Sequence, residues 1–126
     1  MYFFFFRYPT YYNLRANETL CKAYIEDMAK DGEKILLYPP TPQTASTDMG
    51  NVSYIVPSFH GVFCIPTEPD VAIHSAPFAS AAGKDEAHVA AIKCAKGMAM
   101  LALRVFADGS FADEARKDLE KPDPLD

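Results

Sequence analysis

Apolar residues recur at helical spacing in three stretches of the chain. The first stretch begins after Asn17, a favourable N-cap residue, and stops at Gly32. The residues that share its apolar face are Leu20, Ala23, Tyr24 and Met28. The opposite face pairs charges four residues apart, Lys22 with Glu26 and Glu26 with Lys30. The spacing therefore predicts an amphipathic helix at a surface.

The longest helical pattern runs over residues 84–106 and is rich in alanine. The second half of this pattern is apolar nearly all round, so a helix there needs neighbours on most of its sides. Its small side chains permit the close approach of a sheet or another helix. A weaker amphipathic pattern over residues 111–119 predicts a further helix whose charged face is exposed to solvent.

Short apolar runs between these helices predict buried strands. Residues 35–38 and 62–65 are each followed by a proline, and residues 71–73 are expected to end a third strand. The intervening residues 41–57 are dense in Thr, Ser, Asp, Gly and Asn, which favour turns. This order of elements is α/β, with too few strands to cover the long helix. The pattern therefore indicates a piece of a larger domain.

Composition and charge narrow the class of protein. The chain has 126 residues, of which 49% are hydrophobic and 23% charged, so we expect one globular unit. A net charge of −5 leaves no basic surface for nucleic acid or a membrane. Three separated cysteines, Cys21, Cys64 and Cys94, indicate reduced thiols. The apolar residues 1–6 are too few for a signal peptide or a membrane span, so we expect a cytosolic (cytoplasmic) protein.

Three histidines are candidates for metal chemistry, and none lies in a local metal motif. His88 lies inside the alanine-rich pattern, where a helix face accounts for it. His74 follows residues 71–73 at a junction of strand and loop, where an open α/β sheet presents ligands to a cleft. A neutral imidazole there can occupy one position on a zinc ion, but a catalytic site needs three protein ligands. The residues alone do not identify the other ligands.

The segment 46–53 combines hydroxyl groups, the Asp48 carboxylate, a glycine and the Asn51 amide. Such a loop can bind the polar end of a substrate through backbone N–H groups and side chains. The alternative is a network of turns that caps a helix. His60 lies beside this loop, before the second predicted strand. Asp48, Asn51 and His60 are therefore substrate-binding candidates, and no residue is predicted as a catalytic nucleophile or base.

Residues 46–60, Ser-Thr-Asp-Met-Gly-Asn-Val-Ser-Tyr-Ile-Val-Pro-Ser-Phe-His, resemble a stretch of the aminoacylase/carboxypeptidase family of zinc peptidases. The resemblance is to the branch of dipeptidases that includes β-alanyl-lysine (Xaa-basic) dipeptidases. Residues 12–32 resemble the helix that resumes the catalytic domain after the family's inserted lid domain. The other matching positions are residues 63–65, His74, Ser75, Phe78, residues 81–83 and residues 95–100.

The resemblance implies the C-terminal half of a zinc-peptidase catalytic domain, a fragment of a larger α/β/α sandwich. Residues 11–110 would form this half, residues 1–10 a start unlike the fold, and residues 111–126 a short helix and a solvated tail. In the family, two zinc ions polarise the scissile carbonyl and generate hydroxide from bound water. The C-terminal half contributes one histidine to these ions, and the matching position here is His74.

The resemblance also implies an activity, the cleavage of dipeptides or N-acyl amino acids, and a homodimer formed through a lid domain absent here. The sequence lacks the family's His-x-Asp motif and Glu-Glu pair, which hold most metal ligands and the general base. We therefore expect the isolated chain to be inactive, as a truncated gene model or gene fragment would be. One alternative is a non-catalytic half domain that docks to a partner chain, and the last is a free-standing small α/β domain.

Overall fold

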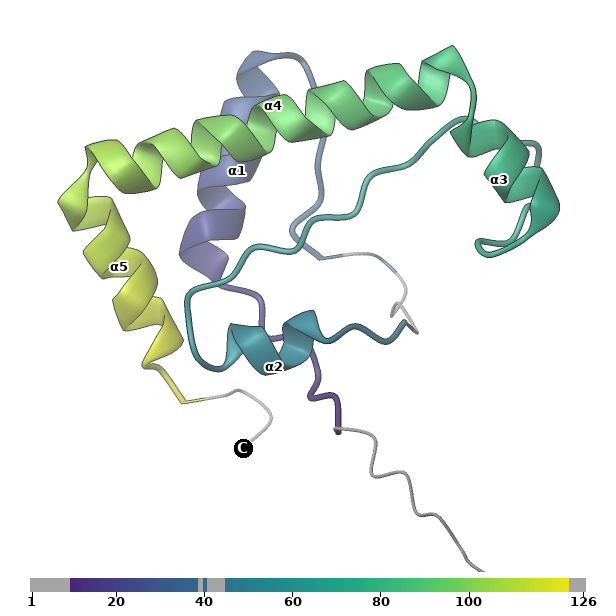
Figure 1. Cartoon of the computed structure of the whole chain (residues 1–126). Coiled ribbons are helices and arrows are strands. Elements are labelled where there is room, and N and C mark those ends of the chain that lie inside the picture. Colours follow the sequence, from purple (N-terminus) through teal and green to yellow (C-terminus); the bar gives the residue numbers. More distant parts are fainter. Residues whose placement is uncertain (1–9, 39, 41–44, 123–126) are drawn as a thin grey trace, which may run out of the picture.

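The computed structural model describes residues 10–38, 40 and 45–122 (Figure 1). The long helix α4 crosses the molecule, with α3 beside its N-terminal end and α5 turning back from its C-terminal end (Figure 1). The helices of the described residues are α1 (Glu18–Lys30), α2 (Met49–Ser53), α3 (Ala76–Ala82), α4 (Asp85–Ala107) and α5 (Gly109–Leu119). Among them, none combines the length and the apolar character that crossing a membrane requires.

Helix α1 forms where the apolar spacing predicts it. The Asn17 side chain accepts a hydrogen bond from the Leu20 N–H at 3.1 Å, which caps the first turn. Gly32 follows the helix end with φ of 81°, a left-handed conformation that favours glycine. All four residues of the predicted apolar face are buried. The prediction of this helix is confirmed, including its N-cap residue and its buried apolar face.

Lys22, Glu26 and Lys30 are exposed, as expected for the charged face of α1, but the two lysines form ion pairs with other residues. Lys22 pairs with Glu18 at 2.6 Å, and Lys30 pairs with Asp27 at 2.9 Å, so neither lysine pairs with Glu26. Glu18 lies four residues before Lys22, the orientation that helices favour for such pairs. Lys30 reaches instead to a carboxylate that the core holds in place. The spacing of charges alone did not reveal this buried acid.

Helix α1 packs against α4, and α5 lies against both. The core residues are Leu20, Ala23, Tyr24, Met28, Leu101 and Ala115. Gly97 of α4 lies so close to α1 that an added Cβ would be 2.6 Å from the Tyr24 ring and would also overlap Met28. The Tyr24 ring also packs on Phe59, with 4.5 Å between the ring centroids. A small residue in α4 therefore permits the close approach that the sequence predicts.

The segments predicted as strands, residues 35–38, 62–65 and 71–73, form no strand in the part of the chain that the structure describes. The backbone of residues 59–71 makes no hydrogen bond to other described backbone groups. Leu36 is 63% exposed and Val62 is 84% exposed, so these apolar runs are not buried. A strand needs a neighbouring edge, and the described residues provide none. The α/β prediction is not met here, but the exposed runs are consistent with a piece of a larger domain.

Helices α4 and α5 form within one or two residues of their predicted bounds. Asp108 separates them and caps α5, because its carboxylate accepts hydrogen bonds from the Ser110 N–H at 2.9 Å and the Phe111 N–H at 3.3 Å. A hydrogen bond from the Ser110 hydroxyl, together with these backbone bonds, holds the pKa of Asp108 below its usual value. The predicted solvated tail lies partly in residues 123–126, outside the described residues.

Candidate functional site

His74 lies in the turn that leads into α3, with its side chain exposed. Its φ of 62° is left-handed, a conformation uncommon for residues other than glycine. The next residue, Ser75, caps α3 by accepting a hydrogen bond from the Phe78 N–H at 3.2 Å. The Ser75 hydroxyl also donates to the Ala72 carbonyl at 2.6 Å. These two bonds fix the backbone on both sides of His74, which leaves the imidazole at the surface.

The described residues do not form a metal site by themselves. Over residues 10–38, 40 and 45–122, no three His, Cys, Asp or Glu side chains lie close enough together to hold a metal ion. A catalytic zinc ion takes three protein ligands, so His74 alone does not fit it. The assignment of His74 as a metal ligand stays a prediction.

The polar side chains of α2 hold the segment that precedes α1. The Asn51 amide oxygen accepts a hydrogen bond from the Tyr12 N–H at 3.2 Å, and its NH₂ donates to the Thr10 carbonyl at 2.9 Å. The Ser53 hydroxyl accepts a hydrogen bond from the Arg15 N–H at 3.0 Å. Asn51 and Ser53 therefore hold residues 10–15 against α2. These bonds support the alternative interpretation of this loop, in which its polar groups have a structural role instead of binding substrate.

Two of the substrate-binding candidates are differently placed from Asn51. Asp48 precedes α2 with an exposed side chain that makes no capping hydrogen bond. His60 is also exposed, in the extended segment after Phe59. Gly50 is buried, and a Cβ added there would overlap the Tyr12 carbonyl. The side chains of Asp48 and His60 are thus open to solvent, whereas the backbone at Gly50 lies against the Tyr12 carbonyl.

The structure does not bring the predicted site residues together. His74 lies beside α3, whereas Asp48 and Asn51 belong to the α2 region. Helices α2 and α3 make no contact and lie well apart in Figure 1. The described residues therefore do not assemble the predicted site by themselves.

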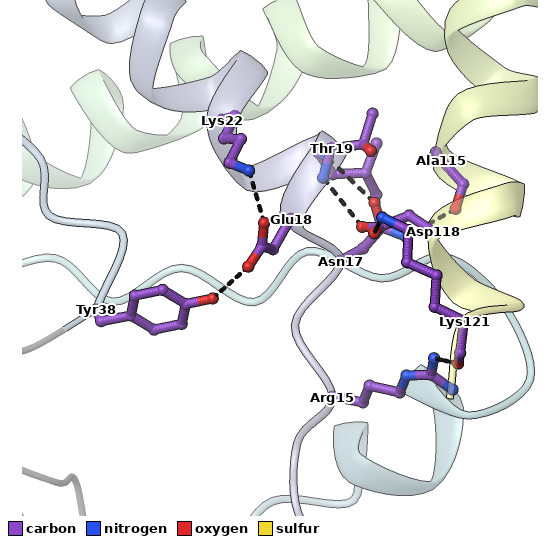
Figure 2. Close-up of polar contacts among 10 residues, drawn as sticks. Arg15, Asn17, Glu18, Thr19, Lys22, Tyr38, Ala115, Asp118 and Lys121 are labelled. Carbon is purple, nitrogen blue, oxygen red and sulfur yellow. Dashed lines mark hydrogen bonds and ion pairs between the residues drawn. The ribbon is translucent and has the colours of Figure 1, made fainter. Parts of the chain in front are cut away.

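A polar junction that the sequence did not reveal joins the start of α1 to the end of α5 (Figure 2). The Asn17 amide donates to the Ala115 carbonyl at 2.8 Å, and the Thr19 N–H donates to Asp118 at 3.1 Å. Lys121 pairs with Asp118 at 2.6 Å. Burial raises the pKa of Asp118, but the bonds from Lys121 and Thr19 outweigh it and lower the pKa overall. The junction is a packing contact between helix ends.

A second contact missed by the sequence analysis joins α1 to α4. Arg104 donates to the Asp27 carboxylate through Nε at 2.7 Å and through Nη2 at 2.6 Å. Asp27 is buried, and the Arg104 hydrogen bonds hold the pKa of its carboxyl below the usual value although burial opposes them. Asp27 lies seven residues after Leu20, on the apolar face of α1, so its burial could have been predicted.

Tyr24 is the one buried phenol in the described core. Its hydroxyl donates to the Cys94 thiol at 3.6 Å. Burial and this hydrogen bond raise the pKa of Tyr24 to about 12. The phenol is therefore protonated at neutral pH and does not act as a base.

An apolar groove of about 260 Å³ opens between α1, α4 and the segment before residue 60. Its lining residues are Leu20, Phe59, Met98, Leu101, Ala102, Val105 and Phe106. A site for a dipeptide needs polar groups placed to bind its charged ends, and this groove has no polar side chain. The groove therefore lacks the chemistry of a dipeptide site.

Two curated dipeptidases match most of the chain. The Xaa-Arg dipeptidase of Mus musculus is 37% identical over 115 residues, which cover 87% of this chain and 26% of the mouse protein. The Xaa-Arg dipeptidase of Homo sapiens is 36% identical over 115 residues, which cover 87% of this chain and 25% of the human protein. The chain is homologous to dipeptidases. The predicted resemblance to this branch of peptidases is thereby confirmed.

The homology covers most of this chain but little of its relatives. The chain spans about a quarter of the length of the two curated dipeptidases. No protein-family model matches the chain, and no solved structure matches it. The part of the dipeptidases that has no counterpart here is therefore about three times as long as the part that does.

Proposed function

We propose that this chain is part of a dipeptidase and acts on dipeptides with a basic C-terminal residue. The observation that carries the proposal is the similarity to two Xaa-Arg dipeptidases, which are 36–37% identical to this chain over 87% of its length. By its resemblance, the complete enzyme would be a cytoplasmic zinc-dependent hydrolase of amide bonds. Its α/β sandwich would include residues 35–38 and 62–65 as strands.

In this proposal His74 supplies one metal ligand. Two observations support this assignment. The His74 imidazole is exposed, so a second segment of polypeptide can approach it, and its backbone has a left-handed conformation. Asp48 and His60, whose side chains are exposed, would face the substrate in the complete enzyme. The remaining metal ligands and the general base would come from residues outside this chain. The 126 residues alone are then inactive.

The test is a chimera in which this chain replaces the matching segment of the Mus musculus Xaa-Arg dipeptidase. We expect the chimera to hydrolyse alanyl-arginine and the chain alone to show no activity. Within the chimera, His74→Ala should lower kcat at least about 100-fold. Replacing a residue that only supports a metal ligand already costs about 10–100-fold in metal affinity or activity, and replacing the ligand itself should cost more. His88→Ala is the matched control and should leave kcat unchanged. A folded chimera without activity, or an active His74→Ala variant, would refute the proposal.

A second candidate is a non-catalytic half domain that acts by docking to a partner chain. The exposure of Val62 and Leu36 in backbone that lacks strand partners favours it. The two candidates differ in one measurement. A docked complex that binds but does not hydrolyse alanyl-arginine would favour the half domain over the enzyme.

A further inference from the structure

The backbone at His74 has a conformation that a residue with a side chain adopts at a cost. Its φ of 62° is left-handed, and the Cβ of a left-handed residue crowds the following carbonyl oxygen. Glycine adopts the same φ freely, so a turn of this kind favours glycine. The chain instead has histidine there, at the residue that the proposed function places in the active site. Backbone strain of this kind is characteristic of functional sites.

Packing within the described residues makes no use of the His74 side chain. The imidazole is exposed, and among the described residues it makes no hydrogen bond or ion pair. The two residues before it, Ala72 and Ile73, are also exposed, so the side chains of this turn contribute nothing to the described core. A left-handed backbone that stabilises no packing indicates that the side chain is needed for function.

The Ser75 hydroxyl holds the turn around His74 from both sides. It donates to the Ala72 carbonyl at 2.6 Å and accepts from the Phe78 N–H at 3.2 Å. The bond from Phe78 caps α3, and a cap needs only an acceptor. The bond to Ala72 uses the hydroxyl proton, which has no part in the cap. Ser75 therefore joins the carbonyl before the turn to the helix after it through one atom.

Helix α3 gives this turn a rigid support. The Ser75 carbonyl accepts a hydrogen bond from the Ala79 N–H at 3.0 Å, and Pro77 stands in the first turn, where its fixed φ suits a helix. Helix α3 contacts α4 and lies beside the N-terminal end of α4 in Figure 1. Side chains on such a support keep the precise geometry that a reaction requires. The position of His74 is thus set by Ser75 and, through it, by α3.

We propose that Ser75 is a positioning residue of the dipeptidase, because its hydrogen bond to the Ala72 carbonyl keeps His74 left-handed and so sets the direction of the imidazole. This inference rests on the proposed function, in which His74 belongs to the active site. Ser75 acts through His74 and does not touch the substrate. Its loss should therefore slow the reaction without weakening the binding of the dipeptide.

The first experiment follows the backbone of His74 by NMR in the full 126-residue chain. A positive φ produces a strong nuclear Overhauser effect between the amide proton of a residue and its own Hα. We expect this signal at His74 in the unsubstituted chain and in Ser75→Thr, whose hydroxyl can make both bonds. Ser75→Asp should lose it, because an ionised carboxylate still caps α3 but has no proton to donate to Ala72.

Two controls accompany the NMR experiment. Asp70 is also left-handed, with φ of 61°, and should keep its own signal in every variant. The Tm of Ser75→Asp should stay within about 2 °C of the unsubstituted chain, because Asp and Ser are similar helix caps. A loss of signal confined to His74 at constant Tm is then a local change and not unfolding.

The second experiment measures kcat and KM of the chimera for alanyl-arginine. Ser75→Ala should lower kcat about 10–100-fold and change KM less than about twofold, because misplacing a reacting group by about 1 Å costs about 100-fold in rate. Ser75→Thr should retain the kcat of the unsubstituted chimera. Ser80→Ala, at an exposed position of α3, is the matched control and should leave kcat unchanged.

The outcomes separate this inference from the proposed function. A left-handed signal at His74 that survives Ser75→Asp would overturn the positioning role, whether or not the chimera is active. An active chimera whose kcat is unchanged by Ser75→Ala would overturn it as well. A folded but inactive chimera, together with loss of the His74 signal in Ser75→Asp, would refute the enzyme and still support the hold of Ser75 on His74.

Discussion

Asp27 is the residue whose replacement tests most directly how α1 is held against α4. Its carboxylate accepts two hydrogen bonds from Arg104, at 2.7 and 2.6 Å, and its side chain is only 5% exposed. Asp27→Ala removes both bonds and leaves the guanidinium without its buried partner. We therefore expect this variant to lower the free energy of unfolding.

The size of the loss follows from the exposure of the two partners. A hydrogen bond to a charged group contributes about 1.5–3 kcal/mol, and breaking a fully buried ion pair costs about 3–5 kcal/mol. The Arg104 side chain is 34% exposed, so it regains part of its hydration when Asp27 is removed. We therefore expect a loss of about 2 kcal/mol, below the range for a fully buried pair.

Glu26→Ala is the matched control for Asp27→Ala. Glu26 is 66% exposed and lies 3.7 Å from the same guanidinium, so its loss should cost less than about 1 kcal/mol. The assay is urea unfolding of the full chain, followed by far-ultraviolet circular dichroism. Adding Arg104→Ala and the double variant gives a coupling energy, expected at about 1.5 kcal/mol or more. If Asp27→Ala costs no more than the control, the pair does not hold the two helices together.

The same pair predicts how stability depends on pH. Because the hydrogen bonds from Arg104 lower the pKa of Asp27 in the folded chain, this carboxyl binds a proton more readily when the chain is unfolded. Its contribution is therefore complete above its unfolded pKa and is lost as the pH falls through the lower, folded value. The difference between the wild type and Asp27→Ala should shrink below about pH 4. A difference that stays constant down to low pH would contradict this account.

Two further predictions concern close packing and the loop at α2. Gly97→Ala should destabilise the chain by about 1 kcal/mol in the same urea assay, because overlap with α1 outweighs the gain in helix propensity. Gly109→Ala is the control. No atom lies within 4 Å of the Cβ added there, so this variant should be neutral or stabilising. Asn51→Ala should cost about 1 kcal/mol and expose residues 10–15 to proteolysis, whereas Asp48→Ala should change the free energy of unfolding by less than about 0.5 kcal/mol. A larger effect of Asp48→Ala than of Asn51→Ala would show that the bonds to residues 10–15 are not what stabilises the loop.

Helices α1, α4 and α5 could be predicted from the sequence because their determinants are local, whereas α2 and α3 were not predicted. The Asn17 cap, the apolar spacing that follows it and the left-handed Gly32 all act within a few turns of one helix. The strands could not be tested in the same way, because residues 62–65 need an edge that the described residues do not supply. A pattern of apolar residues predicts burial, but the partner that provides it can lie outside the sequence at hand.

The contacts between helices could not be predicted from sequence patterns, for a different reason. Asp27 and Arg104 are 77 residues apart, and no spacing rule links two positions at that separation. The loop of Asn51 left two interpretations open, and hydrogen bonds to Thr10 and Tyr12 give its amide a local role. For His74 the described residues supply no further ligands to test against, so its role depends on the chimera.

The separation of α1 from α4 along the chain also has a consequence for how the protein folds. Helices α4 and α5 are joined by Asp108 alone, so their contact forms after closing a very short loop. Bringing Asp27 to Arg104 closes a loop of 77 residues, which costs more entropy before any contact stabilises it. We therefore expect the α4–α5 hairpin to form first and the docking of α1 to limit the rate of folding. Variants that weaken the α1–α4 contact would then increase the unfolding rate of the chain more than they decrease the rate at which the hairpin forms.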